Sequence, residues 1–220
     1  MKGLQSYKTW VFDCDGVILD SNTVKTEAFY EVALPYGKDN AEALVAYHKE
    51  FGGISRFIKF QYFFKQILKK KDFQQEMEEV IGQFGDIVRT KILECPETEG
   101  LYLFLAKISK AKRKIVVSGG MQKELLDVFS RRSLTRYFDN IYGSPDTKPD
   151  ILKRELEQGL LKSPMVYIGD SKHDYECAKR YNSDFIFMTQ YSEFVGWQKY
   201  FKDKPVFITS NLKALACQII

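Results

Sequence analysis

The sequence predicts an α/β protein with a doubly wound parallel sheet and an all-helical segment inserted after the first strand. In the carboxyl-terminal part of the chain, short β-branched and aromatic runs alternate with apolar residues at helical spacing. Continuous apolar strands separated by helices are typical of a parallel sheet covered on both faces. Residues 21–95 show helical spacing almost throughout, although a crossover between parallel strands needs only one helix.

Each predicted element follows from such a run, in chain order. Strands are expected at residues 9–12, 114–118, 138–142, 165–169, 185–188 and 206–209. Helices are expected between or after them at residues 121–133, 149–161, 172–181 and 211–219. In the insertion, helices are expected at residues 27–34, 41–51, 56–68 and 73–92. The chain is therefore predicted to have a core, residues 1–20 and 96–220, and a helical cap, residues 21–95.

Composition excludes several classes of protein. The 220 residues carry a net charge of +4, with acidic residues dispersed among basic ones, so a nucleic-acid partner is not indicated. No signal peptide or membrane-spanning run is visible, which predicts a cytoplasmic protein. The four scattered cysteines predict reduced thiols.

The aromatic segment 190–204 is expected to form a surface helix that packs on the core, and a partner interface is the alternative. The sequence does not indicate the oligomeric state.

The most informative stretch is WVFDCDGVILD, residues 10–20, in which an apolar run ends in Asp13 and Asp15 and a glycine follows. The carboxyl ends of parallel strands meet at the crevice where such folds bind ligands. One aspartate could then act as a nucleophile while the other moves protons. An ordinary turn is the alternative, because Asp and Gly are common turn residues.

Two later segments could bind a phosphate. In IVVSGG, residues 115–120, a strand ends at Ser118, and Gly119 beyond it leaves the backbone amide open to an anion. The alternative is a helix start assisted by Ser118. In PDTKPD, Pro149 follows Lys148 and opens a helix, so the ammonium could point over the strand ends. A solvated loop lysine is the alternative.

The segment VYIGDSKHD, residues 166–174, repeats the pattern of a strand followed by carboxylates. Asp170 follows the strand, and Asp174 lies one helical turn further on. Several carboxylates in one small site would repel one another. A hard divalent cation with oxygen ligands removes that conflict, and Mg²⁺ is the expected ion.

Together, DCDGV, Ser118, Lys148 before Pro149, and GDSKHD resemble the motifs of the haloacid dehalogenase superfamily, in the same order. The helical insertion resembles that superfamily's type C1 cap, as in the phosphoglycolate phosphatase and β-phosphoglucomutase subgroup. The resemblance implies a Rossmann-like core and a Mg²⁺-dependent phosphatase acting on a small phosphorylated metabolite, such as a sugar phosphate or a phosphoglycolate-like acid.

The resemblance also implies a role for each matched residue. Asp13 would form an aspartyl phosphate, and Asp15 would act as general acid and then as general base. The phosphoryl oxygens would be held by Ser118, Gly119 and Lys148. The metal would be bound by Asp13, the Asp15 backbone carbonyl and Asp170, and Asp174 would support that shell.

The GGISR segment, residues 52–56, is similar to the cap loop of sugar-phosphate enzymes in the superfamily. Arg56 is therefore a candidate specificity residue, and a solvent-exposed arginine at a helix start is the alternative. Lys25 stands where β-phosphoglucomutases have a histidine, which favours a phosphatase over a mutase. The mutase remains the second hypothesis, and a catalytically silent binding or regulatory module is the third.

Overall fold

The computed structural model describes residues 3–218 and has a six-stranded sheet at its centre. All neighbouring strands are parallel, and their order is β3-β2-β1-β4-β5-β6. The strands are β1 (Thr9–Phe12), β2 (Arg113–Met121), β3 (Asn140–Ser144), β4 (Met165–Gly169), β5 (Asp184–Met188) and β6 (Val206–Thr209). The predicted fold class, a Rossmann-like parallel sheet flanked by helices, is confirmed.

Helices cover both faces of the sheet. They are α5 (Leu101–Lys107), α6 (Gln122–Arg131), α7 (Lys148–Glu157), α8 (Lys172–Arg180), α9 (Trp197–Phe201) and α10 (Leu212–Ala216). Trp10 and Phe12 pack in one apolar cluster with residues of α5, α6 and α10, whereas Val11 packs in a second cluster with α7 and α8. This alternation follows from the two-residue repeat of a strand, and it buries every side chain of β1.

β1 lies between β2 and β4, and this position determines where its carboxyl end lies. Phe12 is paired with Val116 of β2 on one side and with Ile168 of β4 on the other. The residues that follow these three positions therefore emerge side by side at one edge of the sheet. Asp13, Val117 and Gly169 are the first of them.

Two strands differ from the prediction by more than one residue. β2 was expected to end at Ser118 but continues to Met121, and the register of its pairing with β3 shifts between Val117 and Met121. β3 begins two residues later than expected. The difference in β2 involves its glycines, because a strand that contains Gly119 and Gly120 can depart from regular pairing without ending.

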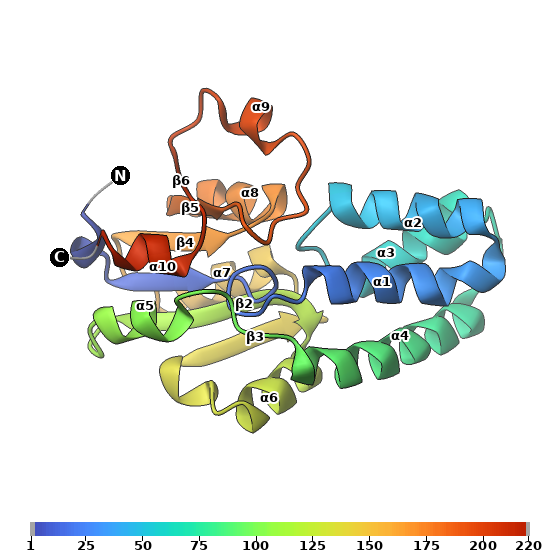
Figure 1. Cartoon of the computed structure of the whole chain (residues 1–220), viewed down its shortest axis with the longest axis horizontal. Helices are drawn as coiled ribbons and strands as arrows, with labels where there is room; N and C mark the ends of the chain where they lie inside the picture. The colour runs from blue at the N-terminus through green and yellow to red at the C-terminus, as the bar shows by residue number, and fades with distance from the viewer. Residues whose placement is uncertain (1–2, 219–220) are drawn as a thin grey trace.

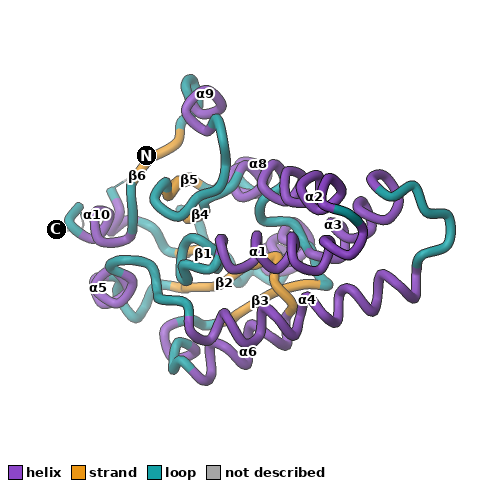
Figure 2. The backbone as a smooth tube through the Cα atoms, turned by 45° about the vertical axis from the view of Figure 1, so that its right-hand side comes forward, coloured by secondary structure: helices purple, strands orange, loops and turns teal. Residues whose placement is uncertain are grey.

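The inserted segment forms helices α1 (Asn22–Ala33), α2 (Lys38–Glu50), α3 (Arg56–Tyr62) and α4 (Gln74–Glu94). Figure 1 shows them grouped beyond the carboxyl ends of the strands. In Figures 1 and 2, α1 lies between α2 and α4. Phe29 of α1 links α3 and α4, since its ring lies 5.2 Å from that of Phe60 and 4.3 Å from that of Phe84. The predicted helix 56–68 divides, because a π-helical turn over Phe63–Ile67 follows α3.

Three further features complete the fold. Segment 190–204 is mostly loop around the short α9, and Phe201 is buried with its ring 4.8 Å from that of Phe187, so the aromatic residues do pack on the core. The helix expected over 211–219 ends earlier, at Ala216, and residue 219 lies outside the described range, as do the first two residues of the chain. Across residues 3–218, none of the helices combines the length and apolar character needed to span a bilayer.

The contact between the start of α5 and α10 gives a test of the fold. Gly100 has a φ of +88°, and a Cβ there would lie 2.3 Å from the Lys213 backbone nitrogen. Gly159 is a matched control, because its φ is +68° but a Cβ would meet nothing within 4 Å. Gly159→Ala should lower the free energy of unfolding by about 1 kcal/mol through its φ alone. Gly100→Ala should cost about 1–3 kcal/mol more, because backbone must move. Equal losses in urea unfolding would contradict this packing.

Candidate active site

The first carboxylates lie in a tight turn directly after β1. The Asp13 N–H donates to the Ile168 carbonyl (2.9 Å), which continues the pairing of β1 with β4. The chain then turns at Gly16, whose φ is +72°. A Cβ on Gly16 would lie 2.4 Å from Asp170 Oδ2, so only glycine allows that carboxylate to approach. The turn expected of Asp and Gly is present, and it brings carboxylates from two strands together.

Lys148 joins two of these carboxylates. The Asp150 N–H donates to Thr147 Oγ1 (3.3 Å), which caps α7 just before Lys148. Lys148 Nζ lies 2.8 Å from Asp13 Oδ1 and 2.7 Å from Asp174 Oδ1, and its side chain is buried. Burial lowers the pKa of Lys148, but the two carboxylates raise it by more, so the ammonium stays charged. The alternative of a solvated loop lysine is wrong.

Asp13, Asp170 and Asp174 form a buried acidic cluster, in which one oxygen from each lies within 4.8 Å of the others. Burial, together with the neighbouring Asp174 carboxylate, raises the pKa of Asp13 to about 7. Burial and then Asp13 likewise raise the pKa of Asp170 well above its ordinary value. Oxygen donors that resist ionising together suit a hard divalent cation, so Asp13 and Asp170 fit the metal that the sequence predicts.

Asp174 differs from its two neighbours because both of its oxygens already accept hydrogen bonds within the protein. Oδ1 accepts from Lys148 and from the Tyr167 hydroxyl (3.0 Å), and Oδ2 accepts from the Ser171 hydroxyl (2.6 Å). Ser171 and Asp174 also cap the start of α8 reciprocally. Although burial alone would raise the pKa of Asp174, Lys148, the Ser171 hydroxyl and His173 together lower it by more. Such a carboxylate is better placed to orient other groups than to bind a metal directly.

Asp15 is held by the inserted segment. The Ser21 hydroxyl donates to Asp15 Oδ1 (2.5 Å), and the Lys25 ammonium donates to Oδ2. Burial raises the pKa of Asp15, but Lys25 and Ser21 lower it by more, so the net shift is downward. Sequence reasoning missed this contact, although four-residue spacing places Ser21 and Lys25 on one side of a helix.

Ser118 is fully buried within β2, and its Oγ accepts a hydrogen bond from the Gly120 N–H (3.0 Å). It does not start the next helix, because α6 begins at Gln122. Gly119 and Gly120 line the cavity that also contains Asp13 and Asp15. A Cβ on Gly119 would lie 2.6 Å from the Gly53 carbonyl, so the bare backbone lets the loop of the inserted segment make contact.

Arg56 reaches the same cavity but is already paired. Its guanidinium makes a two-pronged ion pair with Glu124 of α6, with one N···O distance of 2.9 Å, and it lies 4.7 Å from the Phe84 ring centroid. Arg56 is buried, so the alternative of a solvent-exposed arginine is wrong. The pair joins the inserted segment to the core.

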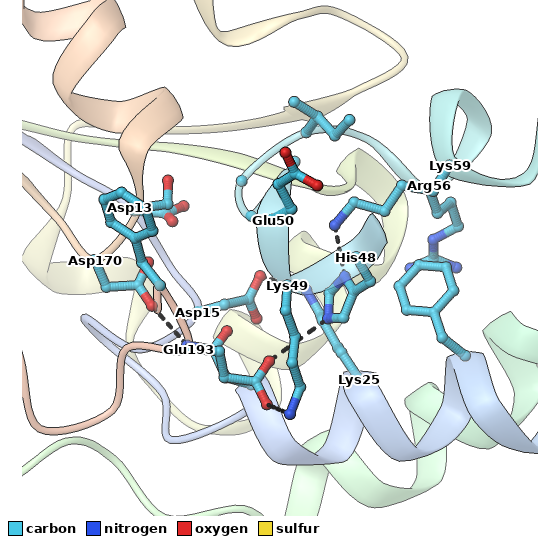
Figure 3. Close-up of a pocket in the computed structure, with 18 of the residues that line it drawn as sticks. Asp13, Asp15, Lys25, His48, Lys49, Glu50, Arg56, Lys59, Asp170 and Glu193 are labelled. Carbon is cyan, nitrogen blue, oxygen red and sulfur yellow. Dashed lines mark hydrogen bonds and ion pairs between the residues drawn. The ribbon is translucent and has the colours of Figure 1, made fainter. Parts of the chain in front are cut away.

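The cavity also contains residues that the sequence did not reveal. Lys59 lies one helical turn after Arg56, and its ammonium is 2.6 Å from His48 Nδ1. Asn22 donates to Asp170 Oδ2 (2.6 Å), and Glu193, in the loop after β5, pairs with Lys49 of α2. Figure 3 shows Asp13 and Asp170 on one side of the cavity and Lys59 and His48 on the other. The Arg56-to-Lys59 spacing was the available signal for Lys59.

The comparisons agree with the motifs. A family model of haloacid dehalogenase-like hydrolases matches residues 10–188. A phosphorylated carbohydrates phosphatase from Thermotoga maritima is 27% identical over an alignment of 178 residues, and the match covers 77% of this chain and 79% of that one. A predicted phosphatase from Clostridium acetobutylicum has a TM-score of 0.74 at 19% identity, covering 97% of this chain and 98% of that one. The β-phosphoglucomutase from Clostridium difficile has a TM-score of 0.73 at 17% identity, covering 95% and 93%. These two structures show the shared fold alone.

Because Lys59 is buried, we expect its charge to lower the free energy of unfolding. Burial, with Lys25 nearby, lowers the pKa of Lys59 from 10.5 to about 7. Between these values the unfolded chain holds the proton and the folded chain does not, so the contribution of Lys59 to stability rises with pH. Lys59→Met should therefore raise the free energy of unfolding by a few kcal/mol at pH 6–7 and by less at pH 9.

Urea unfolding at these pH values measures the effect of Lys59→Met. Lys65, an exposed lysine shortly after α3, gives the control. Lys65→Met should change stability little at either pH. A Lys59→Met variant that is less stable than the wild type at pH 6 would show that the charge is compensated in the folded protein.

Proposed function

The chain belongs to the haloacid dehalogenase-like hydrolases and is therefore an enzyme, and we propose that it is a Mg²⁺-dependent phosphatase of a small phosphorylated metabolite. One observation carries the proposal, namely the buried Lys148 ammonium that lies between Asp13 and Asp174 beside the cavity. The relative from Thermotoga maritima, named for phosphorylated carbohydrates, supports a substrate of that class.

In the proposed reaction Asp13 attacks the phosphorus atom, and the bond from phosphorus to the ester oxygen breaks. Asp15 gives a proton to the leaving oxygen. Water then attacks the aspartyl phosphate while Asp15 accepts a proton from it, which releases phosphate and restores Asp13. The ion pair with Lys25 favours the carboxylate form of Asp15, which accepts a proton in the second step. The first step requires Asp15 to take up a proton when the substrate binds.

Positioning and positive charge supply most of the catalysis in phosphoryl transfer. We propose that Lys148, the Gly119 N–H and the Ser118 hydroxyl hold the phosphoryl oxygens. Ser118 accepts a bond from Gly120, so its own proton remains available for a phosphoryl oxygen.

Asp13, the Asp15 backbone carbonyl and Asp170 are the proposed ligands of Mg²⁺, which would add positive charge beside the phosphoryl group. Asp174 would orient Lys148 and the residues around it, as its four hydrogen bonds indicate.

We also propose that residues 21–95 act as a cap over a core formed by residues 1–20 and 96–220. Gly53 supports this division, because a Cβ there would lie 2.8 Å from Ser171 Oγ and 3.3 Å from Lys148 Nζ. The loop thus rests directly on the proposed catalytic groups. Cap closure would exclude bulk water from the aspartyl phosphate.

The function is tested by phosphate release from a panel of sugar phosphates and 2-phosphoglycolate with Mg²⁺. Asp13→Asn should lower the rate by at least about a thousandfold, because the nucleophile is removed. Asp86→Asn, at an exposed carboxylate of α4, is the matched control and should keep the wild-type rate. An isomerised sugar phosphate without released phosphate would favour the mutase. An Asp13→Asn variant with the wild-type rate would favour a silent module.

The metal site is tested by a measurement that does not depend on turnover. Mg²⁺ should raise the melting temperature of the wild-type protein after EDTA treatment, because a ligand that binds only the folded state stabilises it. Asp170→Asn should lose this rise, whereas Asp86→Asn should keep it. An equal rise in all three proteins would place the bound Mg²⁺ elsewhere.

A further inference from the structure

Lys59 is the exception among the cations of the cavity. Lys25 is paired with Asp15, Lys49 with Glu193 at 3.4 Å, and Arg56 with Glu124. Lys59 lines the same cavity and is buried, yet no carboxylate of the described residues lies within ion-pair distance of its ammonium. Its neighbours are the His48 ring nitrogen and the face of the Phe29 ring, 5.4 Å away.

His48 cannot neutralise this charge. Burial, and then the charge of Lys59, lower the pKa of His48 well below its ordinary value, so the ring is neutral. When Lys59 is protonated it can only donate, so Nδ1 accepts its hydrogen bond and the ring proton is on Nε2. That atom is buried without a hydrogen-bond partner, since the nearest carboxylate oxygen, on Glu193, is 3.8 Å away. Lys59 and His48 therefore offer an unpaired positive charge and an unused N–H donor.

The position of this pair matters as much as its charge. Lys59 and His48 lie across the cavity from Asp13 and Asp170, as Figure 3 shows. A substrate whose phosphoryl group lies at Asp13 would extend its other end toward them. A buried cation without a counter-charge is costly, and an anion beside it would remove most of that cost. The lowered pKa of Lys59 has the same physical origin, and it is expected to rise when an anion binds.

Building on the proposed phosphatase function, we propose that Lys59, with His48 beside it, binds a second anionic group of the substrate. The preferred substrates are then phosphomonoesters that carry a carboxylate or a second phosphate, rather than neutral sugar monophosphates. Arg56 is excluded as the main source of this charge, because Glu124 already neutralises it.

Substrates that differ only in the second group test the proposal. The carboxylate arm compares 6-phosphogluconate with sorbitol 6-phosphate, and the phosphate arm compares fructose 1,6-bisphosphate with fructose 6-phosphate. The wild-type enzyme should favour the doubly anionic member of at least one pair by tenfold or more in kcat/KM, and the arm that shows it identifies the second group. Lys59→Met should reduce that preference by at least tenfold, mainly through KM, and should change the neutral substrate by less than threefold. Lys65→Met is the control and should keep the wild-type preference.

Binding to the Asp13→Asn variant separates this inference from the proposed function. Suppose that the wild-type enzyme hydrolyses no ester, but that Asp13→Asn binds 6-phosphogluconate or the bisphosphate more tightly than its neutral partner. If adding Lys59→Met abolishes this difference in affinity, the phosphatase proposal fails and the inference holds. If the enzyme hydrolyses esters but Lys59→Met weakens all four substrates equally, the inference is wrong and the phosphatase stands. Equal wild-type affinity for both members of both pairs also overturns the inference.

Discussion

The site depends on one buried cation, Lys148. Carboxylates from the ends of two neighbouring strands converge in a region almost free of solvent, where each would raise the pKa of the others. The Lys148 ammonium, 2.8 Å from Asp13 and 2.7 Å from Asp174, offsets part of that repulsion. Removing one partner of a buried ion pair leaves an uncompensated charge. The start of α7, the reciprocal cap of α8 and the turn after β1 therefore act together to keep these three groups in place.

This part of the site is also the part that the sequence predicts well. Asp13 and Asp170 each follow an apolar strand directly, and Lys148 precedes the proline that opens its helix. These positions depend on local rules of strand ends and helix starts, so a parallel sheet brings them together whatever the details of packing. The prediction is less accurate where the sequence does not mark the end of a strand clearly. The glycine-containing β2 was expected to end at Ser118 but ends at Met121.

The other half of the cavity depends on packing between distant segments, which local rules do not describe. Glu124 is 68 residues from Arg56, and nothing in either helix indicates that they pair. The contact of Lys25 with Asp15 depends on where α1 packs, and the position of Glu193 depends on a loop after β5. The sequence identifies charged residues on helices here, but only the folded chain shows which of them are neutralised.

Two buried lysines differ in whether the fold neutralises their charge. Lys148 has two carboxylate neighbours, and its pKa is raised, so its charge is already compensated before any ligand binds. Lys59 has none within ion-pair distance among the described residues, and its pKa is lowered, so holding a charge there costs folding free energy. A core position needs no such cost, because a methionine or leucine would fill the same space. Because the fold provides no negative charge for Lys59, we infer that the ligand provides it. The Lys59 side chain points toward the cavity, where such a ligand would bind.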